Sequence, residues 1–216
     1  MPSGVASGVF VTLEGGDGSG KSTLAEALAT RLRAEGFTVQ MTEEPVGTQL
    51  GRRVWEAFKE RGAAIAPTAE LLFFEGARAQ HVAEVIRPAL ESGEIVLCDR
   101  FSDSSIAYQS YGRGLNLELV QALNDIATGG LKPNLTLLLD IPPESGLARA
   151  DAEMDTQVKD AIGQESLAFH QRVRDGFLAL ARSEPDRFVV IDATLPTATV
   201  TEAAWRSIRS VLRPAT

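Results

Sequence analysis

The chain has 216 residues, 44% of them hydrophobic and 23% charged, which is the composition of an ordinary globular protein with one sizeable core. Its formal net charge of -8 argues against a broad nucleic-acid-binding surface, but not against a local site for a phosphorylated small molecule. The single cysteine, Cys98, excludes an intrachain disulfide. Because Cys98 closes an apolar run, we expect it to be a buried filler and not a reactive thiol.

Residues 1–8 contain neither a basic region nor an apolar segment typical of a signal peptide, and we expect them to form a flexible tail. No apolar run in the sequence approaches the roughly 20 residues that span a bilayer. The sequence therefore predicts a cytoplasmic protein that has no membrane partner and no nucleic-acid partner.

Strand patterns alternate with helical patterns along the chain, which predicts an α/β fold with a parallel sheet covered by helices on both faces. Pro67 favours the start of a helix, Pro88 a break within that helix, and Gly36 the end of an earlier one. The five predicted strands are 9–13, 38–42, 95–98, 135–141 and 188–191. The predicted helices are 24 to about 35, 70–90, 117–127, 165–183 and 200–212.

A glycine-rich loop separates the first predicted strand from the first predicted helix. It has the pattern G-x-x-x-x-G-K-S, with a threonine following, and consists of Gly15, Gly16, Asp17, Gly18, Ser19, Gly20, Lys21, Ser22 and Thr23. Glycines let the backbone wrap a phosphate with its N–H groups pointing inward, and the helix N-terminus adds partial positive charge. Lys21 is expected to reach the β and γ phosphates of ATP, and the Ser22 hydroxyl to bind a magnesium ion. The sequence thus predicts a P-loop three-layer fold that binds ATP with Mg²⁺.

A carboxylate and a guanidinium follow the third predicted strand, at Asp99 and Arg100. Ligands of an open parallel sheet bind beyond the carboxyl ends of its strands, so this pair is expected beside the phosphate loop. Asp99 is suited to hold magnesium, and Arg100 to grip a phosphate through two parallel hydrogen bonds. The alternative is an ion pair at the surface.

Longer stretches of the sequence resemble the bacterial thymidylate kinases, which are P-loop nucleoside monophosphate kinases, over nearly the whole chain. The matching stretches are LEG at 13–15 continuing through 23, EP at 44–45 with GT at 47–48, RAQH at 78–81, DRF at 99–101 with SS at 104–105, AYQ at 107–109, GRG at 112–114 and IDA at 191–193. The resemblance implies one kinase domain over 9–216 with a mobile lid at about 149–165. It also implies a homodimer that transfers the γ-phosphate of ATP to dTMP, giving dTDP for deoxynucleotide biosynthesis.

By the same resemblance, eight side chains bind the acceptor: Glu44, Phe74, Arg78, Arg100, Ser104, Ser105, Tyr108 and Gln109. Phe74 would stack on the thymine ring, and Arg78 would bond its carbonyl edge. Ser105 and Gln109 would help to read the base, and Tyr108 would crowd a ribose 2′-hydroxyl.

Four residues are implied in catalysis, namely Lys21, Asp17, Arg100 and Arg149. Asp17 would lie between the two phosphate sites, near magnesium and the acceptor oxygen. Arg149 stands at the start of the lid, and it could instead stack on the adenine ring of ATP.

Some of these residues have a purely structural alternative. Phe74 lies in an apolar run and could belong to the core. Arg78 and His81 could form a solvated helix face, and for His81 a structural role is favoured. Tyr108 and Gln109 could form the N-terminal turn of a helix without contacting a ligand.

The loop after the second predicted strand departs from the family pattern. Glu43 stands where the family usually has an arginine, and it would repel an acceptor phosphate unless it points away. Trp55 also replaces a common arginine, while Arg52 or Arg53 could substitute for the missing charge.

The lid departs as well, since Ala161 occupies the usual arginine position and Lys159 is the lid's only cation. Arg149, Arg172 and Arg174 remain as candidates to neutralise the transferred phosphoryl group. Two alternatives to a thymidylate kinase therefore stay open. One is a divergent nucleotide-binding homologue with weak or no kinase activity, and the other is a kinase for a different nucleoside monophosphate.

Overall fold

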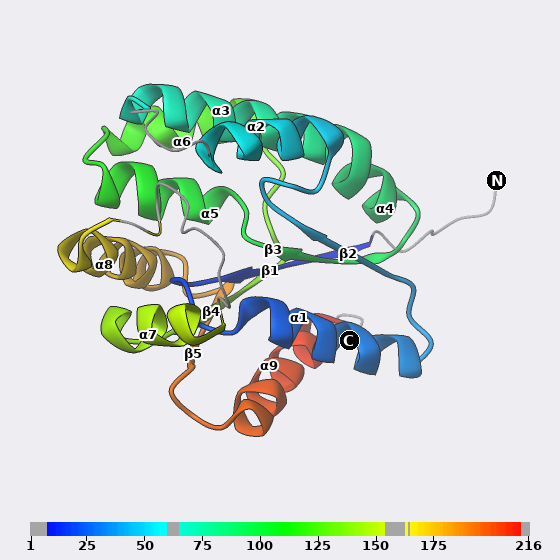
Figure 1. Cartoon of the computed structure of the whole chain (residues 1–216). Helices are drawn as coiled ribbons and strands as arrows, with labels where there is room; N and C mark the ends of the chain where they lie inside the picture. The colour runs from blue at the N-terminus through cyan, green and yellow to red at the C-terminus, as the bar shows by residue number, and fades with distance from the viewer. Residues whose placement is uncertain (1–7, 60–64, 154–162, 164, 213–216) are drawn as a thin grey trace.

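The computed structural model describes residues 8–59, 65–153, 163 and 165–212 (Figure 1). Five parallel strands form one sheet in the order β2-β3-β1-β4-β5. These strands are β1 Val9–Glu14, β2 Val39–Glu43, β3 Ile95–Asp99, β4 Leu135–Asp140 and β5 Phe188–Asp192. The predicted α/β fold, a five-stranded parallel sheet flanked by helices, is confirmed.

Helices cover both faces of this sheet, giving three layers. The helices before the middle of the chain are α1 Lys21–Ala34, α2 Gln49–Lys59, α3 Pro67–His81, the π-helical turn η1 Val82–Ile86 and α4 Arg87–Glu91. The later helices are α5 Ser102–Ser105, the π-helical segment η2 Ile106–Gly112, α6 Leu117–Thr128, α7 Pro143–Glu153, α8 Leu167–Ser183 and α9 Thr197–Leu212. In Figure 1, α1 and α9 lie below the sheet, whereas α2, α3 and α6 lie above it.

Side chains of the central strand alternate between the two layers, as the pleat of a strand requires. Val11 and Leu13 pack in the core that α1 and α9 form against the sheet. Phe10 packs in a second core with Phe101 on the opposite face. Glu14 is four residues after Phe10 on the same strand, so it faces the same side of the sheet, and it is fully buried. The last residue of β1 therefore brings a carboxyl group beneath the upper helices, directly before the phosphate loop.

Three helical segments lack a counterpart among the predicted elements: α2, α5 with η2, and α7. Helix α7 begins at Pro143, where a missing N–H costs no hydrogen bond, so the proline pair that ends β4 also starts a helix. Segment η2 is π-helical and therefore does not follow the 3.6-residue period that reveals an α-helix. The predicted break near Pro88 is confirmed: α3 ends at His81, the π-helical turn η1 follows, and α4 begins with Pro88 in its first turn.

None of the helices in the described part of the chain has the length and apolar character needed to cross a membrane.

Candidate functional site

The phosphate loop connects β1 to α1 and is held open by glycines. Gly15 has φ 138° and Gly18 has φ 65°, a region that favours glycine. A Cβ at Gly15 would lie 2.4 Å from the carbonyl oxygen of Leu139, and one at Gly18 would lie 2.0 Å from that of Gly146. The loop therefore fits against β4 and α7 only with glycine at both positions.

Lys21 is the one cation of this loop, and its side chain is folded back over the loop. Its Nζ lies 2.9 Å from the carbonyl oxygen of Gly16 and 3.2 Å from that of Gly15. Burial, together with the charge of Arg100, lowers the pKa of Lys21 to about 8. The ammonium group is thus held where phosphates are expected, by carbonyl oxygens that neutralise its charge only partly.

Ser22 and Asp99 meet at the start of α1. The Ser22 hydroxyl donates a hydrogen bond of 2.7 Å to Oδ2 of Asp99. Two hard oxygen ligands fit Mg²⁺, which keeps several waters and takes further oxygens from bound phosphates. No cluster of three or more His, Cys, Asp and Glu side chains suited to a metal occurs among the described residues. The pair suits a metal that arrives with a phosphate ligand, because two protein oxygens leave the other coordination positions to water and phosphate.

Arg100 lies between the phosphate loop and the space beyond β3. Its φ of 68° is the one positive φ of a non-glycine residue in the described ranges, and such strain is concentrated at functional sites. Its Nη1 donates to the Gly15 carbonyl (3.1 Å) and its Nη2 to Asp17 Oδ1 (2.6 Å). Burial acts to raise the pKa of Asp17, but Arg100 and Lys21 outweigh it, so that pKa lies below its ordinary value.

A pocket of about 280 Å³ opens beside Arg100. It is lined by Asp17, Glu43, Glu44, Pro45, Val46, Trp55, Phe74, Arg78, Arg100, Ser104, Ser105, Tyr108 and Gln109. All eight side chains expected to bind the acceptor are among them, and they come from three separate stretches of the chain, at 44, 74–78 and 100–109. The structure therefore brings together the residues that the sequence resemblance grouped, although their individual roles stay predictions.

Arg78 lines this pocket and is surrounded by hydrogen-bond acceptors. Its guanidinium donates to Glu44 Oε2 (2.8 Å), Glu75 Oε1 (2.7 Å) and the Ser105 hydroxyl (2.9 Å). Glu44 Oε1 in turn lies 3.1 Å from His81 Nδ1. Arg78 and His81 are 3% and 0% exposed, so the alternative of a solvated helix face is wrong. His81 holds Glu44, as its favoured structural role implies.

The structure also places the other three residues that had a structural alternative, namely Phe74, Tyr108 and Gln109. Phe74 stacks on Phe58 with ring centres 4.9 Å apart, and it still lines the pocket. Tyr108 and Gln109 lie within η2, after α5, so neither belongs to the N-terminal turn of a helix. The Tyr108 ring centre lies 5.2 Å from the guanidinium carbon of Arg100, which places the ring at the Arg100 end of the pocket.

The remaining candidate arginines lie outside the acceptor pocket, although Arg174 lines a second, smaller pocket together with Gly15, Gly16 and Asp17. Arg149 donates to the carbonyl oxygen of Ala193 (2.9 Å), after β5. Arg174 makes two bonds to Asp140, and Arg172 bonds the carbonyl oxygen of Gly112. None of the three lines the 280 Å³ pocket. Their catalytic roles stay predictions.

Only part of the expected lid can be compared with the structure. Residues 149–153 form the end of α7, which the sequence did not predict as helix. Lys159 and Ala161 lie outside the described residues. At the other departure from the family pattern, Glu43 and Trp55 both line the pocket, so Glu43 does not point away from it.

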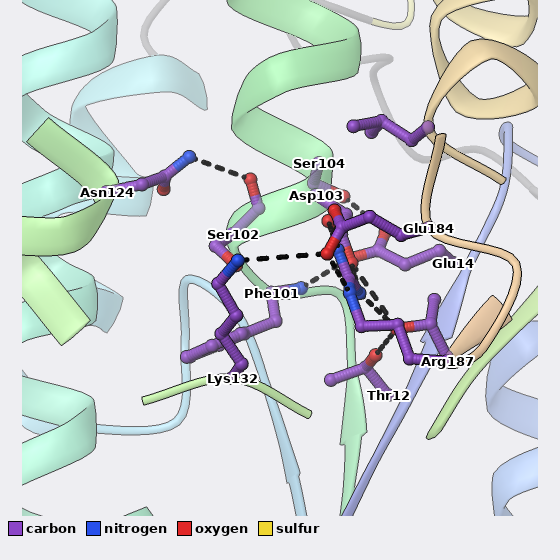
Figure 2. Close-up of polar contacts among 12 residues, drawn as sticks. Thr12, Glu14, Phe101, Ser102, Asp103, Ser104, Asn124, Lys132, Glu184 and Arg187 are labelled. Carbon is purple, nitrogen blue, oxygen red and sulfur yellow. Dashed lines mark hydrogen bonds and ion pairs between the residues drawn. The ribbon is translucent and has the colours of Figure 1, made fainter. Parts of the chain in front are cut away.

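Glu14 fastens the phosphate loop to the turn that carries Arg100. Figure 2 shows its carboxyl group between Phe101 and Ser104. It accepts 2.8 Å from the Phe101 N–H and 2.7 Å from the Ser104 hydroxyl. Close by in the same view, Arg187 makes two bonds of 2.7 Å to Asp103. Burial, reinforced by the charge of Asp103, raises the pKa of Glu14. Little in the sequence indicates that these residues hold the loop and the turn together. The only signal is Glu14 itself, a charged residue at the end of an apolar strand.

The phosphate loop and the pocket meet at Asp17 and Arg100, so the expected phosphate-donor site lies beside the expected acceptor site. A parallel α/β sheet carrying this pair of sites defines the class of P-loop kinases that act on small phosphorylated acceptors. The family model described as thymidylate kinase matches residues 13–204. The chain belongs to the thymidylate kinase family.

Curated relatives match along almost their entire length. The thymidylate kinase of Synechococcus sp. strain JA-2-3B'a(2-13) is 50% identical over 208 residues, covering 96% of this chain and 98% of the relative. That of Deinococcus radiodurans is 48% identical over 204 residues, covering 94% and 98%. That of Desulfovibrio desulfuricans is 49% identical over 211 residues, covering 95% and 97%.

Proposed function

We propose that this chain phosphorylates dTMP with ATP, giving dTDP and ADP. The observation that carries the proposal is the 280 Å³ pocket, which gathers all eight expected acceptor-binding side chains next to the phosphate loop. Membership of the thymidylate kinase family and the names of its relatives support the same reaction.

The proposed transfer needs positioning and charge neutralisation more than covalent chemistry. An oxygen of the dTMP phosphate forms the new bond to the γ-phosphorus, while the bond from that phosphorus to the β–γ bridging oxygen breaks and ADP leaves. Arg100 exchanges its bond to Asp17 for the dTMP phosphate, and Lys21 follows the γ-phosphate. Asp17 then lies between donor and acceptor; in the nucleotide-free protein, Arg100 and Lys21 outweigh burial and hold its pKa below the ordinary value.

Ser22 and Asp99 would hold Mg²⁺ with the phosphates of ATP, since their oxygens meet at the N-terminus of α1. When bound, the metal supplies positive charge to the β and γ phosphates. Arg149, next to the loop that follows β5, is suited to cover the adenine ring.

A steady-state assay of ADP release across nucleoside monophosphates tests the proposal. We expect the highest kcat/KM with dTMP. Nucleotide binding without turnover of any pyrimidine monophosphate would contradict it and favour a divergent nucleotide-binding protein. Preferred turnover of another monophosphate would instead identify a kinase with a different acceptor. This outcome is tested because Glu43, which replaces a usual arginine of the family, lines the pocket.

ATP affinity should fall as the pH rises through about 8. Lys21 is the cause: its pKa of about 8 in the nucleotide-free protein must rise when phosphates bind, so binding takes up a proton above that pH. The affinity for ATP is therefore at its highest below about pH 8. By linkage it is about tenfold weaker at pH 9 than at pH 7.5. Isothermal titration calorimetry measures this change. In Lys21→Ala, affinity should be low at both pH values, and an equal pH effect in that variant would contradict the assignment.

Adding an arginine at position 161 should increase the turnover number. The family resemblance expects a lid arginine there, and an arginine finger contributes on the order of 10³ to 10⁵ in rate. We expect Ala161→Arg to raise kcat by about tenfold or more. The matched control is Ala152→Arg, which adds the same charge to an exposed position of α7 and should leave kcat unchanged. Equal rates for Ala161→Arg and wild type would contradict a missing finger.

We also propose that the protein is a cytoplasmic homodimer. Exposed apolar side chains on the outermost helices support self-association. They lie on α2, α3 and α6, and the largest are Leu50, Leu72, Phe73, Leu119 and Ile126, which are 45% to 77% exposed.

A further inference from the structure

The amide of Gln109 is held in one orientation. Its Nε2 donates a hydrogen bond of 2.9 Å to Glu70 Oε1, and both side chains are buried, each being 2% exposed. A carboxylate can only accept, so the amide nitrogen, and not the amide oxygen, has to face Glu70. Glu70 precedes Phe74 and Arg78 by one and two helical turns on α3, which puts the three residues on one face of that helix.

Glu70 is itself fixed by Arg113. The guanidinium donates to both carboxylate oxygens, at 3.1 Å from Nε to Oε1 and 2.9 Å from Nη2 to Oε2. The other terminal nitrogen of Arg113 pairs with Glu165, just before α8. Two parallel bonds from a guanidinium hold a carboxylate in one plane. The orientation of Gln109 is therefore set by three side chains from three different elements.

The other end of the Gln109 amide belongs to the pocket. Gln109 lines the 280 Å³ pocket, and its Oε1 has no hydrogen-bond partner within the ranges that the structure describes. Arg78 and Ser105 supply hydrogen-bond donors in the same pocket. The base therefore meets one fixed acceptor among donors. A base with an N–H between two carbonyl groups, as in thymine or uracil, matches this arrangement, whereas the ring nitrogen N3 of cytosine carries no hydrogen and is itself an acceptor.

We infer that Glu70, held by Arg113, is a specificity-determining positioning residue that makes the pocket select pyrimidine monophosphates with an N3–H over those without one. The inference rests on the proposed function, because it assumes that the acceptor base enters this pocket. An amide free to turn would present its NH₂ group to cytosine N3 as readily as its oxygen to thymine N3–H. Glu70 acts by preventing that rotation.

The test compares dTMP, dUMP and dCMP with wild type and Glu70→Gln. Steady-state kinetics give kcat/KM, and isothermal titration calorimetry gives the Kd of each monophosphate. In Glu70→Gln, we expect the preference for dTMP over dCMP to fall by about 10- to 100-fold, chiefly through KM. The preference for dTMP over dUMP should not change, since both bases carry N3–H.

Two further variants separate positioning from structural damage. Asp103→Asn makes the same carboxylate-to-amide change at a carboxylate of similar burial that also binds an arginine through two bonds, but outside the pocket. It should lower thermal stability and keep the dTMP-to-dCMP preference. Gln109→Leu should lose the preference, and adding Glu70→Gln to it should cause no further change in the ratio.

A parallel loss of dTMP and dCMP affinity in Glu70→Gln, with the ratio intact, would overturn the inference, as would an undiminished effect in the Gln109→Leu background. If Glu70→Gln does not fold, Arg113→Lys serves instead, because an ammonium group cannot make the two parallel bonds. An unchanged ratio there also overturns the inference. Absence of dTMP turnover by wild type contradicts the proposed function alone, since the Kd ratios still test the role of Glu70.

Discussion

Replacing Lys21 with alanine should lower kcat for dTMP phosphorylation by on the order of 10³-fold. Lys21 is the only cation in the phosphate loop, and its Nζ lies within 3.2 Å of the Gly15 and Gly16 carbonyl oxygens. Without it, the N–H groups of the loop still cradle the phosphates, but no side chain of the loop neutralises the charge that moves during transfer. A coupled assay of ADP release measures the loss, and calorimetry measures the accompanying fall in ATP affinity.

The fold should survive this change. Burial has already lowered the pKa of Lys21 to about 8, which means that the folded protein bears a cost for keeping its ammonium group charged. Thermal unfolding of Lys21→Ala should therefore occur at or above the wild-type temperature near pH 7. Lys132→Ala is the control, because Lys132 is an exposed lysine outside the pocket with one ion pair of 3.7 Å. Retention of more than a tenth of the activity by Lys21→Ala would contradict the role given to Lys21.

The sheet and the phosphate loop could be predicted from the sequence because both depend on local signals. Apolar runs such as 95–98 become strands when they are buried on both faces, and G-x-x-x-x-G-K-S needs only one connection to form its loop. Helix α2 carried a signal too, since Leu50, Val54 and Phe58 recur every four residues. Segment η2 carried none, because a π-helix has a different period.

The residues that line the pocket could be predicted, but the hydrogen bonds that hold them in place could not. The family resemblance implied roles for Gln109 and Arg78, but not for their hydrogen-bond partners Glu70, Glu75 and Asn124. Acidic and amide residues at helical spacing read as a solvated face unless the neighbouring helices are known. Only the packing of α3 against α6 and η2 shows that these polar groups are buried and paired. Long-range pairing of this kind has no local sequence signature.

Arg100→Lys should lower kcat/KM for dTMP by about 10²- to 10³-fold while leaving ATP affinity within a few-fold of wild type. The Arg100 guanidinium reaches the Gly15 carbonyl with one nitrogen and Asp17 with the other, which shows that it can bind two oxygens at once at the border of the two sites. A lysine keeps the charge but loses this planar, two-pronged geometry, so the acceptor phosphate is held less well and less accurately in line. Steady-state kinetics with varied dTMP, together with calorimetry of ATP binding, measure the two effects separately.

Arg187→Lys is the matched control for Arg100→Lys. Arg187 also uses two guanidinium nitrogens, each 2.7 Å from a carboxylate oxygen of Asp103, but it does not line the pocket. Loss of its paired bonds should reduce thermal stability and leave the KM for dTMP unchanged. If Arg100→Lys instead weakened ATP binding and kept the KM for dTMP, Arg100 would belong to the donor site. Its strained backbone would then serve the phosphate loop, and the acceptor phosphate would depend on Arg78 or on another cation of the chain.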